Sequence, residues 1–167
     1  MRKRTLLSLV SVVPMLAACG FRLRGVPEFA FRSLFIQAPR GSMLARELER
    51  TLASSNEQLK VLRDPSSPDA AEVIFVLLSE NRERVVVGLN ASGQVRELQL
   101  RLRVRFKLRK PDGDDVIADT ELLQQRDISY NETIALSKEA EEQMLYRNMQ
   151  ADVVQQLLRR LAAVKTL

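Results

Sequence analysis

The chain has 167 residues, of which 46% are hydrophobic and 28% charged, as in an ordinary globular protein. It contains no histidine and a single cysteine, which excludes Ser-His-Asp and Cys-His nucleophilic sites, ordinary zinc sites and any intramolecular disulfide. The formal charge is +5, but three cations lie in the first four residues, and the remainder has 23 Lys and Arg against 21 Asp and Glu. We therefore expect no catalysis, no metal, no cofactor and no nucleic-acid partner.

The N-terminus has the pattern of a secretory signal peptide. A basic start at 2–4 precedes an uncharged, mostly apolar run at 5–16, which is shorter than the ~20 residues that a membrane-spanning helix needs. Small residues at 17–18 precede Cys19, and this junction resembles the lipobox that a lipoprotein signal peptidase cuts. A lone cysteine is more often a small buried thiol, but the basic start favours lipid modification here. We predict that residues 1–18 are removed and that Cys19 carries the lipid.

Resemblance to bacterial lipoproteins implies a diacylglyceryl group on the Cys19 sulfur and usually an acyl group on its amine. Several acyl chains hold a protein durably on a membrane that it does not span. Gly20 is not the aspartate that marks inner-membrane retention in enteric bacteria, so we expect an anchor in the outer membrane. We predict a lipidated tether at 19–28 and a single domain at 29–167.

The first half of this domain is predicted to contain a strand, a helix and a buried strand. The apolar residues at 33–38 indicate a strand. Ser42 can cap an amphipathic helix that ends near Ser55, and the two prolines at 64–68 predict a loop after a short apolar stretch. The apolar run at 73–78 predicts a central strand covered on both faces, which Val85 and its neighbours continue towards a turn at 90–93.

The clearest periodic pattern follows that turn. Apolar residues at every second position from Leu98 to Leu108 alternate with polar ones, which predicts a strand with one buried face. A turn at 110–114 leads into a return strand at 116–128. The polar side of the first strand forms a basic row of five cations spaced about 7 Å apart: Arg101, Arg103, Arg105, Lys107 and Arg109.

The last segment is predicted to be a helix of about 25 residues that begins at an N-cap, Ser137. Its predicted buried stripe starts at Met144 and ends at Leu161. The order of elements indicates an α+β fold with a mainly antiparallel or mixed sheet of about four strands and two helices packed on one face.

Two groups of acids are candidate sites by composition alone. Asp112, Asp114, Asp115 and Asp119 lack the ligand spacing of an EF-hand loop and are expected at a solvated hairpin tip. Glutamates at 139–142 lie where the helix dipole favours acids, so acid-base catalysis is not expected there.

The basic row is the remaining candidate site, and three interpretations of it stay open. It can be a solvated sheet face, it can meet an acidic protein surface such as a polar barrel lumen, or it can bind the phosphorylated head of a glycolipid.

The sequence Cys-Gly-Phe-Arg-Leu-Arg-Gly at 19–25 closely resembles the start of mature lipoproteins of the LptE lipopolysaccharide-assembly family, and 135–161 reads like the final segment of that family. The resemblance implies a non-enzymatic subunit that plugs the outer-membrane β-barrel LptD, helps it assemble and binds lipopolysaccharide. Lys138 matches a basic position associated in the family with lipopolysaccharide binding, although it can equally be a solvated lysine at a helix start.

The turn at 90–93 departs from relatives that can offer a cation there, because the nearest cation in this chain is Arg96. This departure puts the lipid-binding role of the turn in doubt and leaves Arg96 as a candidate beside Lys138 and the basic row. The alternative function is a scaffold or adaptor lipoprotein of another envelope lipid-transport or cell-wall complex.

Overall fold

The structure is a computed structural model that describes residues 28–130 and 135–167. The predicted signal peptide, Cys19 and nearly all of the predicted tether lie outside the described residues.

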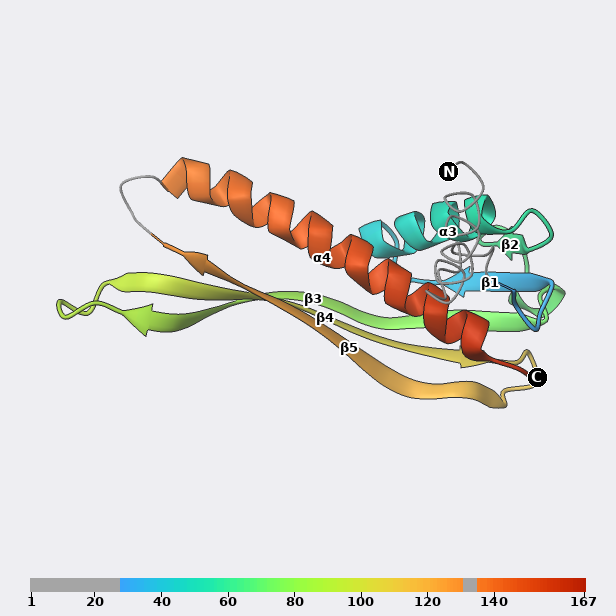
Figure 1. Ribbon diagram of the computed structural model, residues 1–167. Coiled ribbons are helices and arrows are strands. Elements are labelled where there is room, and N and C mark those ends of the chain that lie inside the picture. The colour runs from blue at the N-terminus through green and yellow to red at the C-terminus, as the bar shows by residue number, and fades with distance from the viewer. Residues whose placement is uncertain (1–27, 131–134) are drawn as a thin grey trace, which may run out of the picture.

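A five-stranded mixed sheet is the framework of the described fold (Figure 1). Its spatial order is β2-β1-β3-β4-β5; β2, β1 and β3 run parallel, whereas β3, β4 and β5 form an antiparallel meander. The prediction of an α+β fold is confirmed, with one strand more than the four expected. The strands are β1 (Ser33–Gln37), β2 (Lys60–Leu62), β3 (Val73–Leu89), β4 (Val95–Arg109) and β5 (Asp115–Ser129).

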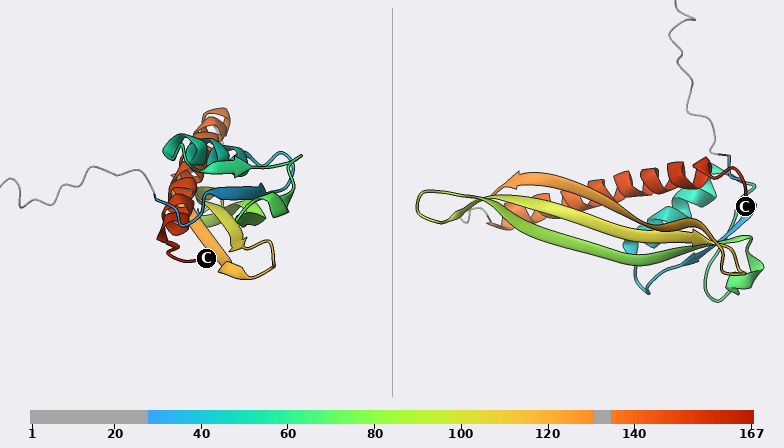
Figure 2. Two further views of the ribbon diagram at one scale, coloured as in Figure 1. Left: turned by 90° about the vertical axis from the view of Figure 1, so that its right-hand side faces the viewer. Right: turned by 90° about the horizontal axis from the view of Figure 1, so that it is seen from below.

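Two long helices cover one face of this sheet, as predicted (Figures 1 and 2). Helix α3 (Met43–Ser55) begins after Ser42, whose side chain accepts a hydrogen bond from the Ala45 amide at 3.0 Å, so the predicted cap is confirmed. Helix α4 (Ala135–Ala163) runs along most of the length of the meander. A single turn of 3-10 helix, η1 (Pro68–Ala70), lies in the predicted loop before β3.

The main core lies between the helices and the face of β4 that carries its apolar residues. Leu100, Leu102 and Phe106 of β4 are fully buried, and the Phe106 ring stacks on Phe75 of β3 with centroids 5.5 Å apart. Met149, Leu157 and other residues of α4 pack on the same cluster. The period of two in the sequence therefore corresponds to the buried face of the sheet.

The opposite face has a second, smaller cluster at the parallel end of the sheet. Phe35, Ala71 and Ile74 are buried there. Because Phe75 is buried on the helix side, the prediction that the run at 73–78 is covered on both faces is confirmed for its first residues. Further along β3 a bulge interrupts the pairing between Leu77 and Ser79. The β3–β4 hairpin then extends beyond the end of β5 and the start of α4, where Leu89 is 61% exposed (Figure 1).

Two predictions about the last helix are wrong. The helix begins at Ala135, so Ser137 lies inside its first turn and is not the N-cap. Met144 is 48% exposed, because it lies about 100° around the helix from Leu145 and away from the stripe that contains Met149 and Val153. The predicted stripe is otherwise correct from Met149 to Leu161.

Candidate functional site

The basic row lies on the face of β4 that points away from the helices. Its five members alternate with the buried residues of the strand, as the sequence predicted. The flanking strands place carboxylates beside it, because β4 pairs along its length with β3 on one side and with β5 on the other. These carboxylates belong to Glu83, Asp115, Asp119 and Glu121. The expectation that Asp115 and Asp119 lie at the hairpin tip is wrong, because both belong to β5.

Three cations of the row form ion pairs with these acids. Arg103 bridges the two neighbouring strands: its Nε lies 3.3 Å from Glu83 Oε1, and its Nη1 lies 2.5 Å from Glu121 Oε1. Arg105 pairs with Asp119. Lys107 Nζ lies 3.3 Å from Asp115 Oδ1. We call this set of pairs the charge ladder.

The two end members of the row have neutral partners among the described residues. Arg101 Nε donates to Gln99 Oε1 at 2.8 Å, and Arg109 Nη1 donates to the Lys110 carbonyl at 3.3 Å. The face therefore carries alternating charges, which differs from the uniform positive field expected from β4 alone. Acids of the return strand were visible in the sequence, but their register opposite the basic row was not.

The acids of the ladder favour the charged form of its two arginines. Hydrogen bonds from Glu83 and Glu121 raise the pKa of Arg103, and the hydrogen bond and charge of Asp119 raise the pKa of Arg105. An arginine is charged across the physiological pH range even without these contacts, so the shift does not change the charge of either group. Because the pairs are exposed to solvent, their role is to set the charge pattern of the surface more than to stabilise the fold.

Lys138, near the start of α4, contacts the end of β5. Its Nζ donates to Glu141 Oε2 at 2.8 Å and to Ser129 Oγ at 3.2 Å, and its side chain is only 13% exposed. An ammonium group has three N–H donors, so one donor has no partner among the residues that the structure describes. The structure therefore differs from the expectation of a simply solvated lysine, and it leaves Lys138 able to donate to one further anion.

Arg96 lies at the same end of the sheet. Its side chain is exposed, and its carbonyl accepts a hydrogen bond from the Tyr130 amide at 2.8 Å. The next residue, Glu97, pairs with Ser129, which is the residue that Lys138 contacts. Arg96 and Lys138, distant in sequence, are thus brought to one end of the meander.

The predicted turn beside them is confirmed, and it carries no cation. Asn90 Oδ1 accepts hydrogen bonds from the amides of Ser92 and Gln94 at 3.0 and 2.9 Å, and Gly93 adopts a positive φ of 78° that closes the turn.

The candidate residues do not form one compact site. Arg109 lies 13 residues beyond Arg96 on β4, which corresponds to about 44 Å of extended strand. A single head group at Arg96 and Lys138 therefore cannot reach the far end of the basic row. Within the described residues, neither helix combines the length and apolarity that crossing a bilayer requires.

Comparisons with known proteins agree with this architecture. Residues 31–161 match the family described as "LptE: Lipopolysaccharide-assembly". A Yersinia enterocolitica protein named LPS-assembly lipoprotein LptE is 32% identical over 169 residues, which cover 98% of this chain and 78% of the relative. Its namesake from Yersinia pestis is 31% identical over 168 residues, with the same coverage.

Two solved structures have a similar fold. The uncharacterized lipoprotein B of Nitrosomonas europaea superposes with a TM-score of 0.72 and 34% identity, covering 86% of this chain and 91% of that one. The rare lipoprotein B of Shewanella oneidensis has a TM-score of 0.64 at 21% identity, covering 78% and 94%, and this likeness concerns the fold alone. The match over most of the domain and the identity to its named relatives lead to one conclusion: the chain belongs to the LptE lipopolysaccharide-assembly family.

Proposed function

We propose that this chain is a lipid-anchored subunit of the lipopolysaccharide translocon of the outer membrane, which plugs the LptD β-barrel from the periplasmic side and helps it assemble. Family membership over residues 31–161 is the observation that carries the proposal. The charge ladder supports it, because a body inside a barrel lumen needs a polar exterior that matches a polar wall. The anchor is the lipid on Cys19.

The same proposal includes binding of lipopolysaccharide at the end of the meander near the turn. Lys138 has a donor to spare and Arg96 is exposed without a carboxylate partner among the described residues, so both can approach a phosphate. The cations of the basic row, from Arg101 to Arg109, are proposed as further contacts along the sheet. A phosphate at Arg103, Arg105 or Lys107 meets the neighbouring carboxylates of the charge ladder, whereas Arg96 has no carboxylate partner among the described residues, which makes the turn end the stronger part of the site.

The proposed role includes no chemical reaction. The chain has no histidine, and its single cysteine is assigned to the lipid. We therefore propose that the chain acts by binding and assembly. It contacts the barrel protein and pairs its cations with phosphates of lipopolysaccharide.

Copurification from native outer membranes tests this proposal. The full chain, tagged at its C-terminus, is expected to recover a large outer-membrane barrel, and mass spectrometry is expected to find lipid on Cys19 as the first residue. Recovery of inner-membrane or cell-wall proteins alone would favour the adaptor alternative. An unprocessed N-terminus in the native host would remove the anchor on which the proposal depends.

A further inference from the structure

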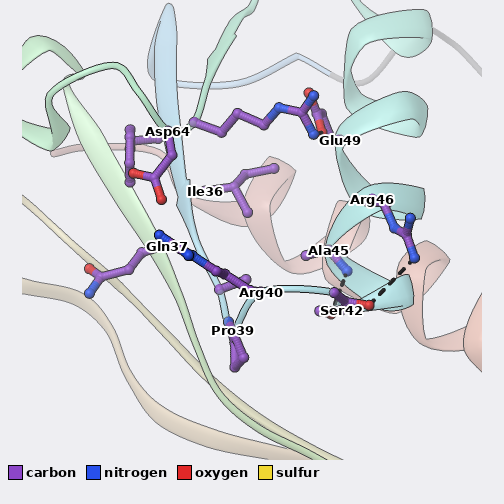
Figure 3. Close-up of a pocket in the computed structure, with 13 residues that line it drawn as sticks. Ile36, Gln37, Pro39, Arg40, Ser42, Ala45, Arg46, Glu49 and Asp64 are labelled. Atoms are coloured by element: carbon purple, nitrogen blue, oxygen red, sulfur yellow. Dashed lines mark hydrogen bonds and ion pairs between the residues drawn. The ribbon is translucent and has the colours of Figure 1, made fainter.

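A cavity of about 250 Å³ lies where β1 ends and α3 begins (Figure 3). One wall is the end of β1 with the connection that follows it, at 35–42. The first turns of α3 form the second wall, and Arg63 and Asp64, which follow β2, form the third. A shallower hollow of about 410 Å³ shares part of this lining and adds Met43 and Arg50.

The backbone of β1 is incompletely paired at this cavity. Its pairing with β2 stops at Phe35, whereas its pairing with β3 continues to Gln37. Within the described part of the chain, Ile36 and Gln37 thus have no neighbouring strand on the β2 side. An unpaired strand edge offers N–H and C=O groups that an extended polypeptide can bind by adding a strand.

The side chains around this edge are predominantly cationic. Arg63 is paired with Glu49 at 3.0 Å, so these two charges balance. Within the described ranges, Arg46 contacts two neutral groups, the Gly41 carbonyl at 3.4 Å and the Met43 sulfur at 2.7 Å.

Arg40 has no hydrogen bond or ion pair with the residues that the structure describes. Figure 3 shows Arg40 crossing the end of β1 on the side of Asp64, with Arg46 on the helix opposite. Among the described residues, the guanidinium groups of Arg40 and Arg46 thus have no carboxylate partner, and Asp64 is the one acid of the lining that is not paired with Arg63.

We propose that this cavity binds an acidic, extended segment of the barrel partner, which adds a strand beside Ile36 and Gln37 and places carboxylates against Arg40 and Arg46. The inference rests on the proposed function and names a contact through which it works. The strand edge favours a polypeptide over a lipid, because Ile36 and Gln37 lie in extended geometry beyond the end of the β2 pairing, where an added strand can continue the hydrogen bonding of β2. The arginines select acidic side chains, which accept bidentate hydrogen bonds from guanidinium.

Site-specific photo-cross-linking in the native host tests which molecule occupies the cavity. A photoreactive residue at Gln37, which is exposed at the end of β1, is expected to cross-link to a barrel segment that contains Asp or Glu. The same residue at Gln143 on the exposed side of α4 is the control and is expected to label a different segment or none. Cross-links from Gln37 to lipid alone, to a segment without acids, or to nothing in an intact complex would overturn the inference.

Charge variants of the full lipidated chain test the role of the arginines. Arg40→Glu with Arg46→Glu is expected to lower barrel recovery about tenfold, and the milder Arg40→Gln with Arg46→Gln is expected to lower it less. Arg147→Glu with Arg159→Glu makes the same charge change on exposed positions of α4 and is expected to stay within about twofold of wild type. Thermal unfolding checks that all variants fold. The glutamate of Arg46→Glu is not expected to destabilise α3, because an acidic side chain near a helix N-terminus interacts favourably with the helix dipole.

The outcomes separate the two proposals. Equal recovery with the cavity and control variants, when the wild type recovers the barrel, overturns the cavity inference alone. Failure of the wild type to recover any barrel overturns the proposed function and this inference with it. A loss confined to the cavity variants, reversed by a basic substitution in the cross-linked acidic segment, establishes the contact.

Discussion

The Tyr146 hydroxyl of α4 donates a 2.7 Å hydrogen bond to the main-chain carbonyl of Glu83, whose carboxylate accepts from Arg103 on the opposite face of the sheet. One residue of β3 thus joins the helix layer to the charge ladder. Arg82 lies over the Tyr146 ring, 5.2 Å from its centroid, and donates to Gln150 at 3.2 Å. Beyond Leu77, where β3 has no buried side chains, the strand is therefore held to α4 by polar contacts.

Replacing Tyr146 with Phe should remove the hydrogen bond to Glu83 and lower the free energy of unfolding by about 1 kcal/mol near neutral pH. Burial, with a smaller contribution from the charge of Glu142, raises the pKa of Tyr146. An unfolded tyrosine titrates near pH 10, so the wild type loses stability as pH rises above about 10 towards the higher folded-state pKa. Urea unfolding at pH 8 and pH 11 should show the gap between the two proteins shrinking. A constant gap would contradict this assignment.

The charge ladder predicts a compensating pair of substitutions. Arg103→Glu places a third acid beside Glu83 and Glu121 and should lower the urea midpoint. Adding Glu121→Arg restores one opposite-charge pair across β4 and β5 and should recover part of the loss. The effect should weaken in high salt, because the pairs are exposed to solvent. If the double variant is no more stable than Arg103→Glu, the cross-strand pair is not formed.

Adjacent leucines of β5 provide a matched test of the core. Leu122 is 3% exposed and packs in the main cluster, whereas Leu123 is 44% exposed on the other face. Leu122→Ala should cost about 2–5 kcal/mol, because it removes buried methyl groups and leaves a cavity. Leu123→Ala should change stability by about 0.5 kcal/mol or less. Equal costs in chemical denaturation would show that β5 pairs in a shifted register.

Binding to immobilised lipopolysaccharide should depend on the turn end of the meander. Lys138→Gln with Arg96→Gln is expected to weaken binding about tenfold, or about 1.4 kcal/mol, because it removes two cations that can meet phosphate. Arg159→Gln with Lys165→Gln, at the far end of α4, makes the same charge change and should bind like the wild type. Reversing the charges of Lys138 and Arg105 together, by substitution with glutamate, should also weaken binding to lipopolysaccharide. Equal binding by all these variants would place the lipid elsewhere.

The elements that could be predicted from the sequence are those with a long hydrophobic periodicity. Strand β4 and the buried stripe from Met149 to Leu161 follow directly from periods of 2 and 3.6. Strand β2 was missed because three residues carry no period, and it exists only because β1 offers a parallel neighbour. The start of α4 was misplaced because Ser137 has the chemistry of a cap without the position of one.

The candidate site was less predictable than the fold. The basic row was correctly placed on one face, but its neutralisation depends on the register of β5 against β4, which local sequence does not specify. The contact of Lys138 with Ser129 likewise depends on how α4 returns along the sheet, whereas its pair with Glu141 is local to the helix. The cavity beside Ile36 arises from the different lengths of two short parallel strands, so no local sequence motif predicts it.

The charge ladder also determines how this face of the sheet meets its surroundings. Since each of its three cations already holds a counter-ion on the same surface, an approaching wall of either sign gains little long-range attraction. Contact becomes favourable only when the hydrogen bonds within the charge ladder are replaced by an equal number of hydrogen bonds to the other surface. That surface needs polar groups at the same spacing as the ladder. Recognition by this part of the face is therefore expected to depend on short-range fit more than on long-range charge attraction.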